Sequence, residues 1–166
     1  MQIEEKIAEL CIRHGVTVST AESCTGGLVA GTLINAPGIS AVYKEGYITY
    51  SNEAKEKLLH VPVDILENYG AVSPQTAFAM AEGCSRAANS DFAVATTGIA
   101  GPGGGTPDKP VGLVYIGCCG KGDTRTLKRQ YSGSRMEVRK QAVQDALEFL
   151  YERLQEYFTT NGGTSI

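Results

Sequence analysis

Hydrophobic side chains recur at two spacings along this chain, and each spacing predicts a different kind of element. Over residues 3–14 they fall at positions i, i+4, i+7 and i+8, which is one stripe of an amphipathic helix that ends at Gly15. Residues 16–21 are mostly β-branched, which favours a short strand. Residues 91–97 form a compact apolar run, typical of a strand buried on both faces.

The rest of the chain continues this alternation of helices and strands. Further helices are predicted over residues 25–35, 51–59, 61–70, 73–88 and 135–157, and further strands over residues 43–50, 111–119 and 125–131. A Lys121-Gly122-Asp123 turn between the last two strands indicates an antiparallel hairpin, so the sheet is expected to be mixed. The pattern predicts an α/β fold, a three-layer α/β/α sandwich with about five to six strands. Residues 1–158 are expected to form a single domain and residues 159–166 a flexible tail.

The composition agrees with one globular domain. Of the 166 residues 42% are hydrophobic and 20% charged, which excludes a disordered chain, collagen and a coiled coil. A net charge of −3 disfavours binding to duplex nucleic acid, so no nucleic-acid partner is expected. The uncharged stretch of residues 23–43 is interrupted by glycines and Pro37, so neither a membrane span nor a membrane partner is expected.

Cysteine and histidine usage bears on compartment and metal binding. The five cysteines form no CxxC pattern and no secretory signal precedes them, so we expect reduced thiols in the cytoplasm. The two histidines, His14 and His60, lack the spacing of metal ligands. We therefore expect no metal site.

The sharpest local feature is the segment Ala21-Glu22-Ser23-Cys24-Thr25-Gly26-Gly27, between a predicted strand and a predicted helix. Unpaired N–H groups at a helix N-terminus favour negative charge, and glycines there let a ligand approach the backbone. Ser23 or Cys24 would thus be a nucleophile beside an oxyanion or phosphate cradle. A thiolate at Cys24 would need a neighbouring histidine or cation to stabilise it. The alternative is that Ser23 or Thr25 only caps the helix.

The segment Tyr50-Ser51-Asn52-Glu53-Ala54-Lys55 offers a candidate base. A lysine acts as a general base when burial lowers its pKa until the amine is neutral at working pH. Because no histidine stands at an obvious spacing from Ser23, a Ser–Lys pair is the natural alternative to a Ser–His triad. The other reading of Lys55 is a solvated lysine on a helix surface.

Two more segments have the composition of a binding site. Residues 98–110 hold five glycines and three prolines after a buried strand, where ligands of open α/β sheets bind, but they lack the ending of a Walker loop. Seven of the fifteen Lys and Arg residues fall between positions 121 and 140, where Arg135 could bind a phosphate bidentately. A flexible solvent loop and a charged outer face are the respective alternatives.

Five segments in this order resemble the motifs of one family, the CinA C-terminal domain with its nicotinamide-nucleotide amidases (NMN deamidases). They are residues 21–27, 47–55, 70–73, 98–102 and 109–112, and the resemblance covers about residues 5–155. Some members carry a large N-terminal domain that resembles molybdopterin-binding proteins. This chain is similar to the stand-alone form without it.

The resemblance implies hydrolysis of the carboxamide of nicotinamide mononucleotide, giving nicotinate mononucleotide and ammonia, with no metal or organic cofactor. It implies Ser23 as nucleophile, Lys55 as base and Tyr50 as proton carrier, with nearby Tyr47 as the alternative to Tyr50. The substrate-binding residues it implies are Thr25, Gly26, Gly27, Thr97, Gly98, Ala100, Gly101, Arg135 and Arg139. The implied partner is a small pyridine mononucleotide, and the implied assembly is a homo-oligomer.

Three questions stay open at this stage. One is whether the turn around Thr25-Gly26 or the one around Thr97-Gly98 holds the oxyanion, the other loop then taking the phosphate. Another is whether the substrate is a different amide. The last is whether the chain is a non-catalytic nucleotide-binding module linked to competence or DNA damage. Of these alternatives, only an enzyme that uses the Ser–Lys pair requires the side chains of Ser23 and Lys55 to lie within hydrogen-bond distance of each other, roughly 3 Å.

Overall fold

Five strands form one mixed sheet in the computed structural model, which describes residues 1–161. They are β1 (Val18–Glu22), β2 (Tyr43–Ile48), β3 (Phe92–Gly98), β4 (Leu113–Gly120) and β5 (Asp123–Gln130), in the order β2-β1-β3-β4-β5. β1 pairs in parallel with β2 and with β3, whereas β3 with β4 and β4 with β5 are antiparallel. The predicted mixed sheet with its hairpin is confirmed.

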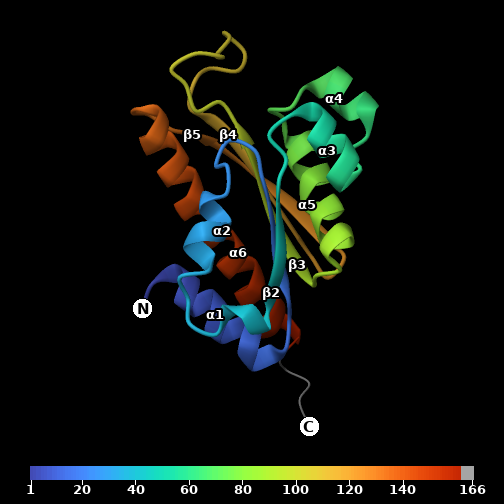
Figure 1. The fold of residues 1–166 in the computed structure, drawn as a ribbon, viewed down its shortest axis with the longest axis vertical. Helices are drawn as coiled ribbons and strands as arrows, with labels where there is room; N and C mark the ends of the chain where they lie inside the picture. Colours follow the sequence, from blue (N-terminus) through green and yellow to red (C-terminus); the bar gives the residue numbers. More distant parts are fainter. Residues whose placement is uncertain (162–166) are drawn as a thin grey trace.

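Helices cover both faces of this sheet (Figure 1). They are α1 (Ile3–His14), α2 (Leu28–Leu33), α3 (Asn52–Leu59), α4 (Val63–Tyr69), α5 (Pro74–Ala88) and α6 (Arg135–Asn161), with a short 3-10 helix, η1 (Ile39–Ala41). The helices α1, α2 and α6 lie on one side of the sheet, and α3, α4 and α5 on the other (Figure 1). The predicted α/β/α sandwich is confirmed.

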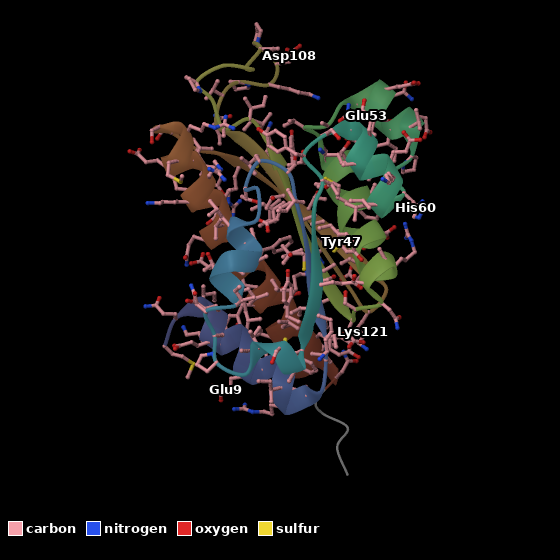
Figure 2. The ribbon with its side chains drawn as sticks, viewed as in Figure 1. Glu9, Tyr47, Glu53, His60, Asp108 and Lys121 are labelled. Atoms are coloured by element: carbon pink, nitrogen blue, oxygen red, sulfur yellow. The ribbon has the colours of Figure 1, made fainter. Side chains whose placement is uncertain are left out.

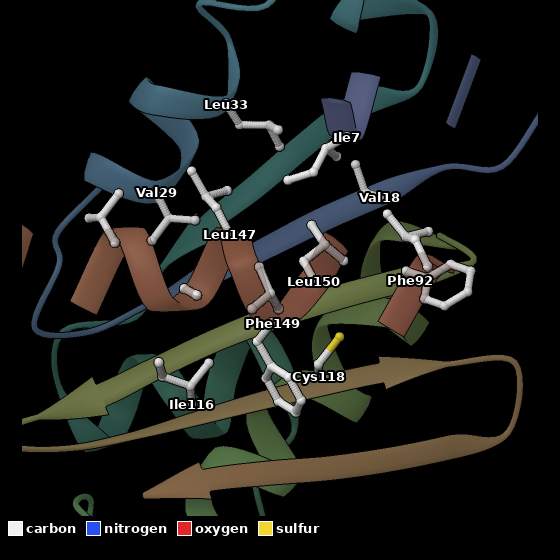
Figure 3. Close-up of a cluster of buried hydrophobic side chains, with 14 of the residues drawn as sticks. Ile7, Val18, Val29, Leu33, Phe92, Ile116, Cys118, Leu147, Phe149 and Leu150 are labelled. Atoms are coloured by element: carbon white, nitrogen blue, oxygen red, sulfur yellow. The ribbon is translucent and has the colours of Figure 1, made fainter. Parts of the chain in front are cut away.

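The two sides of the sheet are packed with side chains of different size. Large side chains such as Phe92, Leu147 and Leu150 fill the side of α1, α2 and α6 (Figure 3), and burying each one stabilises the fold by roughly 1.5–3 kcal/mol. On the side of α5 about half of the buried hydrophobic residues are alanines, which lie beside larger residues such as Met80 and Leu59. A Cβ on Gly117 of β4 would lie only 2.3 Å from the carbonyl oxygen of Ala77, so α5 approaches the sheet at backbone distance.

The ends of the predicted elements shift by a few residues, and two helices differ most. The helix expected over residues 25–35 is the six-residue α2, because Gly26 and Gly27 adopt positive φ angles of 55° and 103°, which no helix allows. The predicted end of the last helix at residue 157 is too early, because α6 continues to Asn161, into the range expected to form the tail. Residues 162–166 of that tail lie outside the described residues.

Parallel pairing brings the carboxyl ends of β1, β2 and β3 to one edge of the sheet. The backbone N–H of Ser23 donates to the Thr96 carbonyl oxygen (3.0 Å), and the N–H of Thr49 donates to the Glu22 carbonyl oxygen (2.8 Å). The chain segments that leave the three strands are therefore tied to one another. Ser23, Tyr50 and Gly98, which lie at or just after these ends, meet at the same place.

Candidate active site

A cavity of about 310 Å³ opens at this edge of the sheet. It is lined by the segments after β1, β2 and β3, by the segment before α5 and by the first residue of α6. The lining residues are Ser23, Cys24, Tyr50, Lys55, Ala71, Val72, Thr97, Gly98, Ile99, Ala100, Gly101, Gly103, Gly104 and Arg135. Ligand pockets span roughly 300–1,000 Å³, so this cavity suits a small ligand.

Ser23 and Lys55 are in contact in this cavity, although they are 32 positions apart in the sequence. Lys55 Nζ lies 3.1 Å from Ser23 Oγ. Ser23 directly follows β1, and Lys55 sits in the first turn of α3, whose start is capped by Ser51 accepting from the Ala54 N–H (3.0 Å). The expected hydrogen-bond distance between the two side chains is confirmed.

Lys55 is buried, with 1% of its surface exposed, so the reading as a solvated helix lysine is wrong. Burial lowers the pKa of Lys55 to about 8, and the weaker influence of Cys24 and Glu53 opposes this shift. Lys55 Nζ also donates to the carbonyl oxygens of Thr49 (2.8 Å) and Tyr50 (3.4 Å). The amine is therefore fixed in direction as well as shifted toward its neutral form.

Lys55 Nζ donates to three oxygen atoms, those of Ser23, Thr49 and Tyr50, and the Ser23 hydroxyl donates in turn to the Tyr50 carbonyl oxygen (3.5 Å). An ammonium carries three N–H groups and no lone pair, whereas a neutral amine carries two N–H groups and one lone pair. When Lys55 loses a proton, the two carbonyl oxygens can still accept its N–H groups, and its lone pair can point toward Ser23 Oγ. This is the geometry of a general base beside a nucleophile.

A buried carboxylate closes the turn that carries Ser23. Glu22, with 1% of its surface exposed, accepts from the N–H groups of Val29 (2.7 Å) and Ala30 (3.1 Å) and from the hydroxyl of Thr25 (2.6 Å). Glu22 thus takes the first N–H groups of α2 that a ligand anion would need. The N–H groups of Val29 and Ala30 are therefore taken by an internal side chain, whereas Glu22 leaves the N–H groups of the turn before α2, at Cys24 and Thr25, to other acceptors.

Four of the expected substrate-binding residues are not among the residues that line the cavity. Thr25 is fully buried, and its hydroxyl contacts Glu22 and Thr96. Arg139 Nε donates to the Cys24 carbonyl oxygen (3.0 Å) and its Nη2 to that of Thr25 (3.1 Å), so its guanidinium holds backbone. The four residues are Thr25, Gly26, Gly27 and Arg139.

The loop after β3 supplies another wall, and Arg135 lies beside it. Thr97 Oγ1 donates to the Ala71 carbonyl oxygen (2.7 Å), which joins this loop to the segment before α5. The exposed Arg135 donates from Nη1 to the Gly101 carbonyl oxygen (2.8 Å) and from Nη2 to the Tyr50 hydroxyl (3.1 Å). The expected residues that do line the cavity are Thr97, Gly98, Ala100, Gly101 and Arg135.

Two rival assignments are separated by the geometry. Tyr50 lines the cavity, whereas Tyr47 lies on β2 (Figure 2) against the cluster of buried residues beneath α5, where burial raises its pKa to about 12. Cys24 also lines the cavity, but burial raises the pKa of its thiol to about 11, so a thiolate is scarce at neutral pH. The geometry favours Tyr50 over Tyr47 and Ser23 over Cys24.

Some residues of the site were not assigned a role from the sequence. Ala71 and Val72 form part of the cavity wall, and Glu22 holds the nucleophile turn. All three stand inside segments that carry the family resemblance, next to assigned residues, so their position was a usable signal. Their side chains gave no chemical reason to choose them.

Residues 1–161 also bear on metal binding and on membrane insertion. These residues bring together no cluster of three or more His, Cys, Asp or Glu side chains that could hold a metal. None of their helices has the length and apolar composition needed to cross a bilayer. All five cysteines are free thiols.

Comparison with known sequences identifies close relatives. The chain is 55% identical over 152 residues to a Clostridium novyi protein named "Putative competence-damage inducible protein", and 49% identical over 154 residues to a protein of the same name from Clostridium kluyveri. The alignments cover 92% and 93% of this chain but 37% and 38% of those relatives. This chain therefore spans little more than a third of the length of the curated relatives it matches.

Solved structures agree over nearly the full length of both chains. A competence/damage inducible protein from Agrobacterium tumefaciens is 44% identical with a TM-score of 0.85, covering 93% of this chain and 97% of that one. A CinA superfamily protein from Klebsiella pneumoniae is 34% identical with a TM-score of 0.89, covering 93% and 96%. The family model of the CinA C-terminal domain matches residues 1–154. This chain belongs to the CinA C-terminal domain family.

Proposed function

We propose that this chain hydrolyses the carboxamide of nicotinamide mononucleotide through a covalent ester on Ser23. The observation that carries the proposal is the 3.1 Å contact between Lys55 Nζ and Ser23 Oγ inside a cavity. A buried amine with a lowered pKa beside a hydroxyl is what a Ser–Lys hydrolase requires. The motifs that resemble nicotinamide-nucleotide amidases support the choice of substrate.

The first step forms the ester and releases ammonia. Neutral Lys55 takes the proton of Ser23, and Ser23 Oγ attacks the carboxamide carbon, which the cationic pyridine ring makes electron-poor. When the C–N bond breaks, the leaving nitrogen takes a proton from the Lys55 ammonium, directly or through the Tyr50 hydroxyl. Water, deprotonated in turn by Lys55, hydrolyses the ester and gives nicotinate mononucleotide.

The negative oxygen of the tetrahedral intermediate needs hydrogen-bond donors. Cys24 and Ala100 line the cavity, and within residues 1–161 their backbone N–H groups donate to no acceptor in another residue. Donors left free for developing charge are typical of an oxyanion site. We assign the oxyanion to the turn after Ser23, which places the phosphate toward the other loop.

The substrate phosphate is assigned to Arg135. It is the one arginine among the lining residues, it stands at the exposed rim, and its guanidinium already binds two oxygen atoms, those of Gly101 and Tyr50. A phosphate can replace these acceptors in a bidentate contact. The glycine-rich backbone of residues 98–104 can then approach the same group.

An ammonia-release assay tests the proposal. Ammonia is measured after incubation of the chain with nicotinamide mononucleotide, nicotinamide riboside and nicotinamide, for wild type, Ser23→Ala and the exposed control Ser40→Ala. We expect release from the mononucleotide with wild type and Ser40→Ala, and a loss of about 10³-fold or more with Ser23→Ala. Equal rates in wild type and Ser23→Ala would exclude the mechanism.

A non-catalytic role is the second candidate, because the relatives carry the name competence-damage inducible. In that case nicotinamide mononucleotide would bind, as calorimetry can measure, with no ammonia released by any variant. Release from a different amide alone would keep the mechanism and change the substrate. A cytoplasmic location and a homo-oligomeric assembly remain part of the proposal, and fractionation and light scattering test them.

A further inference from the structure

Arg139 contacts the carbonyl groups of the two residues that follow the nucleophile. Its Nε and Nη2 donate to the carbonyl oxygens of Cys24 (3.0 Å) and Thr25 (3.1 Å), although Arg139 is more than a hundred positions away in the sequence. Gly26 leaves room for this contact, because a Cβ at this position would lie only 3.3 Å from Arg139 Nη2. The guanidinium and the turn are thus fitted closely to each other.

Holding these carbonyl groups also fixes N–H groups. In a trans peptide the C=O of one residue and the N–H of the next point in opposite directions. The Cys24 carbonyl bound by Arg139 therefore turns the Thr25 N–H away from α6. The Ser23 carbonyl, held by the Gly26 N–H at 3.1 Å, fixes the Cys24 N–H in the same way.

These two N–H groups are the donors nearest to Ser23 along the chain after it. Within residues 1–161 neither donates to an acceptor in another residue, and Cys24, which carries the first of them, lines the cavity. A cation bound to a carbonyl oxygen also polarises the peptide group, which strengthens the N–H at its other end as a donor.

We infer that Arg139 is a positioning residue of the oxyanion site, which it sets through the carbonyl groups of Cys24 and Thr25. This inference rests on the proposed function and assigns a residue to it that does not touch substrate. It replaces the expectation that Arg139 binds the substrate, where a phosphate contact would be its natural role. The two roles differ in what they predict for a reagent that has no nucleotide phosphate.

A small alkyl fluorophosphonate separates the two roles. It reacts with an activated serine: the Ser23 Oγ–P bond forms, the P–F bond breaks, fluoride leaves, and the serine proton passes to Lys55. The negative P–O oxygen uses the oxyanion site in the transition state. Variants are Arg139→Met, Arg139→Lys and the control Arg129→Met, whose guanidinium binds Asp145 on the outside of the fold (3.0 Å).

We expect Arg139→Met to lower the second-order rate of Ser23 labelling by about 10- to 100-fold, and Arg139→Lys by a smaller factor. Arg129→Met should label at the wild-type rate. The pH midpoint of labelling should stay the same in all variants, because Lys55 is untouched. With nicotinamide mononucleotide, kcat should fall and KM should stay close to the wild-type value. If Arg139→Met does not fold, the Arg139→Lys rate decides.

Other results would overturn the inference. Wild-type labelling rates in both Arg139 variants, together with a raised KM for the mononucleotide, would make Arg139 a phosphate ligand. A wild-type chain that is labelled at Ser23 but releases no ammonia would reject the substrate alone, while the labelling rates would still decide on Arg139. A wild-type chain that is not labelled at all would overturn both proposals.

Discussion

The turn after β1 and the loop after β3 leave neighbouring parallel strands at the same edge of the sheet, yet they are built in opposite ways. Both are rich in glycine. In the turn, residues 23–27, the hydroxyl of Thr25 donates to the carboxylate of Glu22, which also accepts from the backbone at the start of α2. The guanidinium of Arg139 donates to the backbone carbonyl oxygen of Cys24. In the loop, the backbone of residues 98–104 lines the cavity instead.

Glycine after a strand therefore has more than one structural use. Gly27 has a positive φ of 103°, and a Cβ there would come within 3.2 Å of the Ile48 side chain, so it serves the internal packing of the turn. A Cβ on Gly103 would meet nothing within 4 Å. A rigid turn suits a nucleophile, which must be held in one direction, and an open backbone suits ligand binding.

The largest effect is expected from Lys55 at the rigid end of the site. Because the pKa of Lys55 is lowered to about 8 and catalysis needs its neutral form, kcat/KM should rise about tenfold per pH unit up to about pH 8 and then level off. Lys55→Met should lower kcat about 10³-fold and abolish this rise. Steady-state assays from pH 6 to 9 measure both, and a flat wild-type profile would contradict the assignment.

Lys55 should also change the pH dependence of the free energy of unfolding in a defined direction. Since its folded pKa lies below its unfolded value, Lys55 holds fewer protons in the folded state between pH 8 and 10.5, and its contribution to the free energy of unfolding rises with pH in this window. Buried cysteines such as Cys24, whose pKa values are raised, act in the opposite direction, but they are common to wild type and Lys55→Met. The difference in the free energy of unfolding between the two proteins, measured by urea titration, should therefore grow by about 3 kcal/mol in favour of wild type across this window. Parallel curves for the two proteins would show that the lysine is not perturbed.

Glu22→Gln tests whether the turn depends on the buried carboxylate. The amide would place a nitrogen against the N–H groups of α2, so we expect the free energy of unfolding to fall by about 2–4 kcal/mol. Urea denaturation measures it, with the exposed Glu67→Gln as the matched control. An unchanged urea midpoint would mean that the carboxylate of Glu22 does not stabilise the turn, and that the turn differs from the loop less than described above.

Arg135→Met tests the binding end of the comparison. Loss of a charged contact to phosphate should raise KM for nicotinamide mononucleotide about 10-fold or more, with kcat changed less than about twofold. Nicotinamide riboside, which has no phosphate, should show no such change between wild type and the variant. A fall in kcat alone would place Arg135 with the chemistry instead.

The smallest effect is expected from Cys24. Because burial raises the pKa of its thiol to about 11, Cys24→Ala should change kcat/KM less than about threefold. Iodoacetamide at neutral pH should leave wild-type activity intact over a time in which an exposed thiol is fully alkylated. Loss of activity in Cys24→Ala would instead support Cys24 as the nucleophile.

Most elements of the fold could be predicted because their signals are local. The spacing of apolar residues over 3–14, the cap at Ser73 and the apolar run of β3 are each contained in one segment. The pairing of Ser23 with Lys55 was also accessible, since few other bases are present and both residues stand in family motifs.

What the sequence could not predict depends on contacts between distant segments. Glu22 reaches forward to α2 and takes the N–H groups of Val29 and Ala30, which the pattern left for a ligand. Arg135 and Arg139 look equivalent on one helix, and only the loop opposite each of them decides that one lines the cavity and the other holds backbone. The role of each side chain depends on which distant residues it contacts in the fold, and a single sequence does not show those contacts.

The spacing of these two arginines has a consequence for how this site can change. They lie four positions apart on α6, so about one turn of the helix separates them. One inserted residue between them would rotate the second by about 100° relative to the first. Exposed positions between them, such as Glu137, can therefore change more easily than the number of residues can, because one helical turn sets the direction of one guanidinium relative to the other.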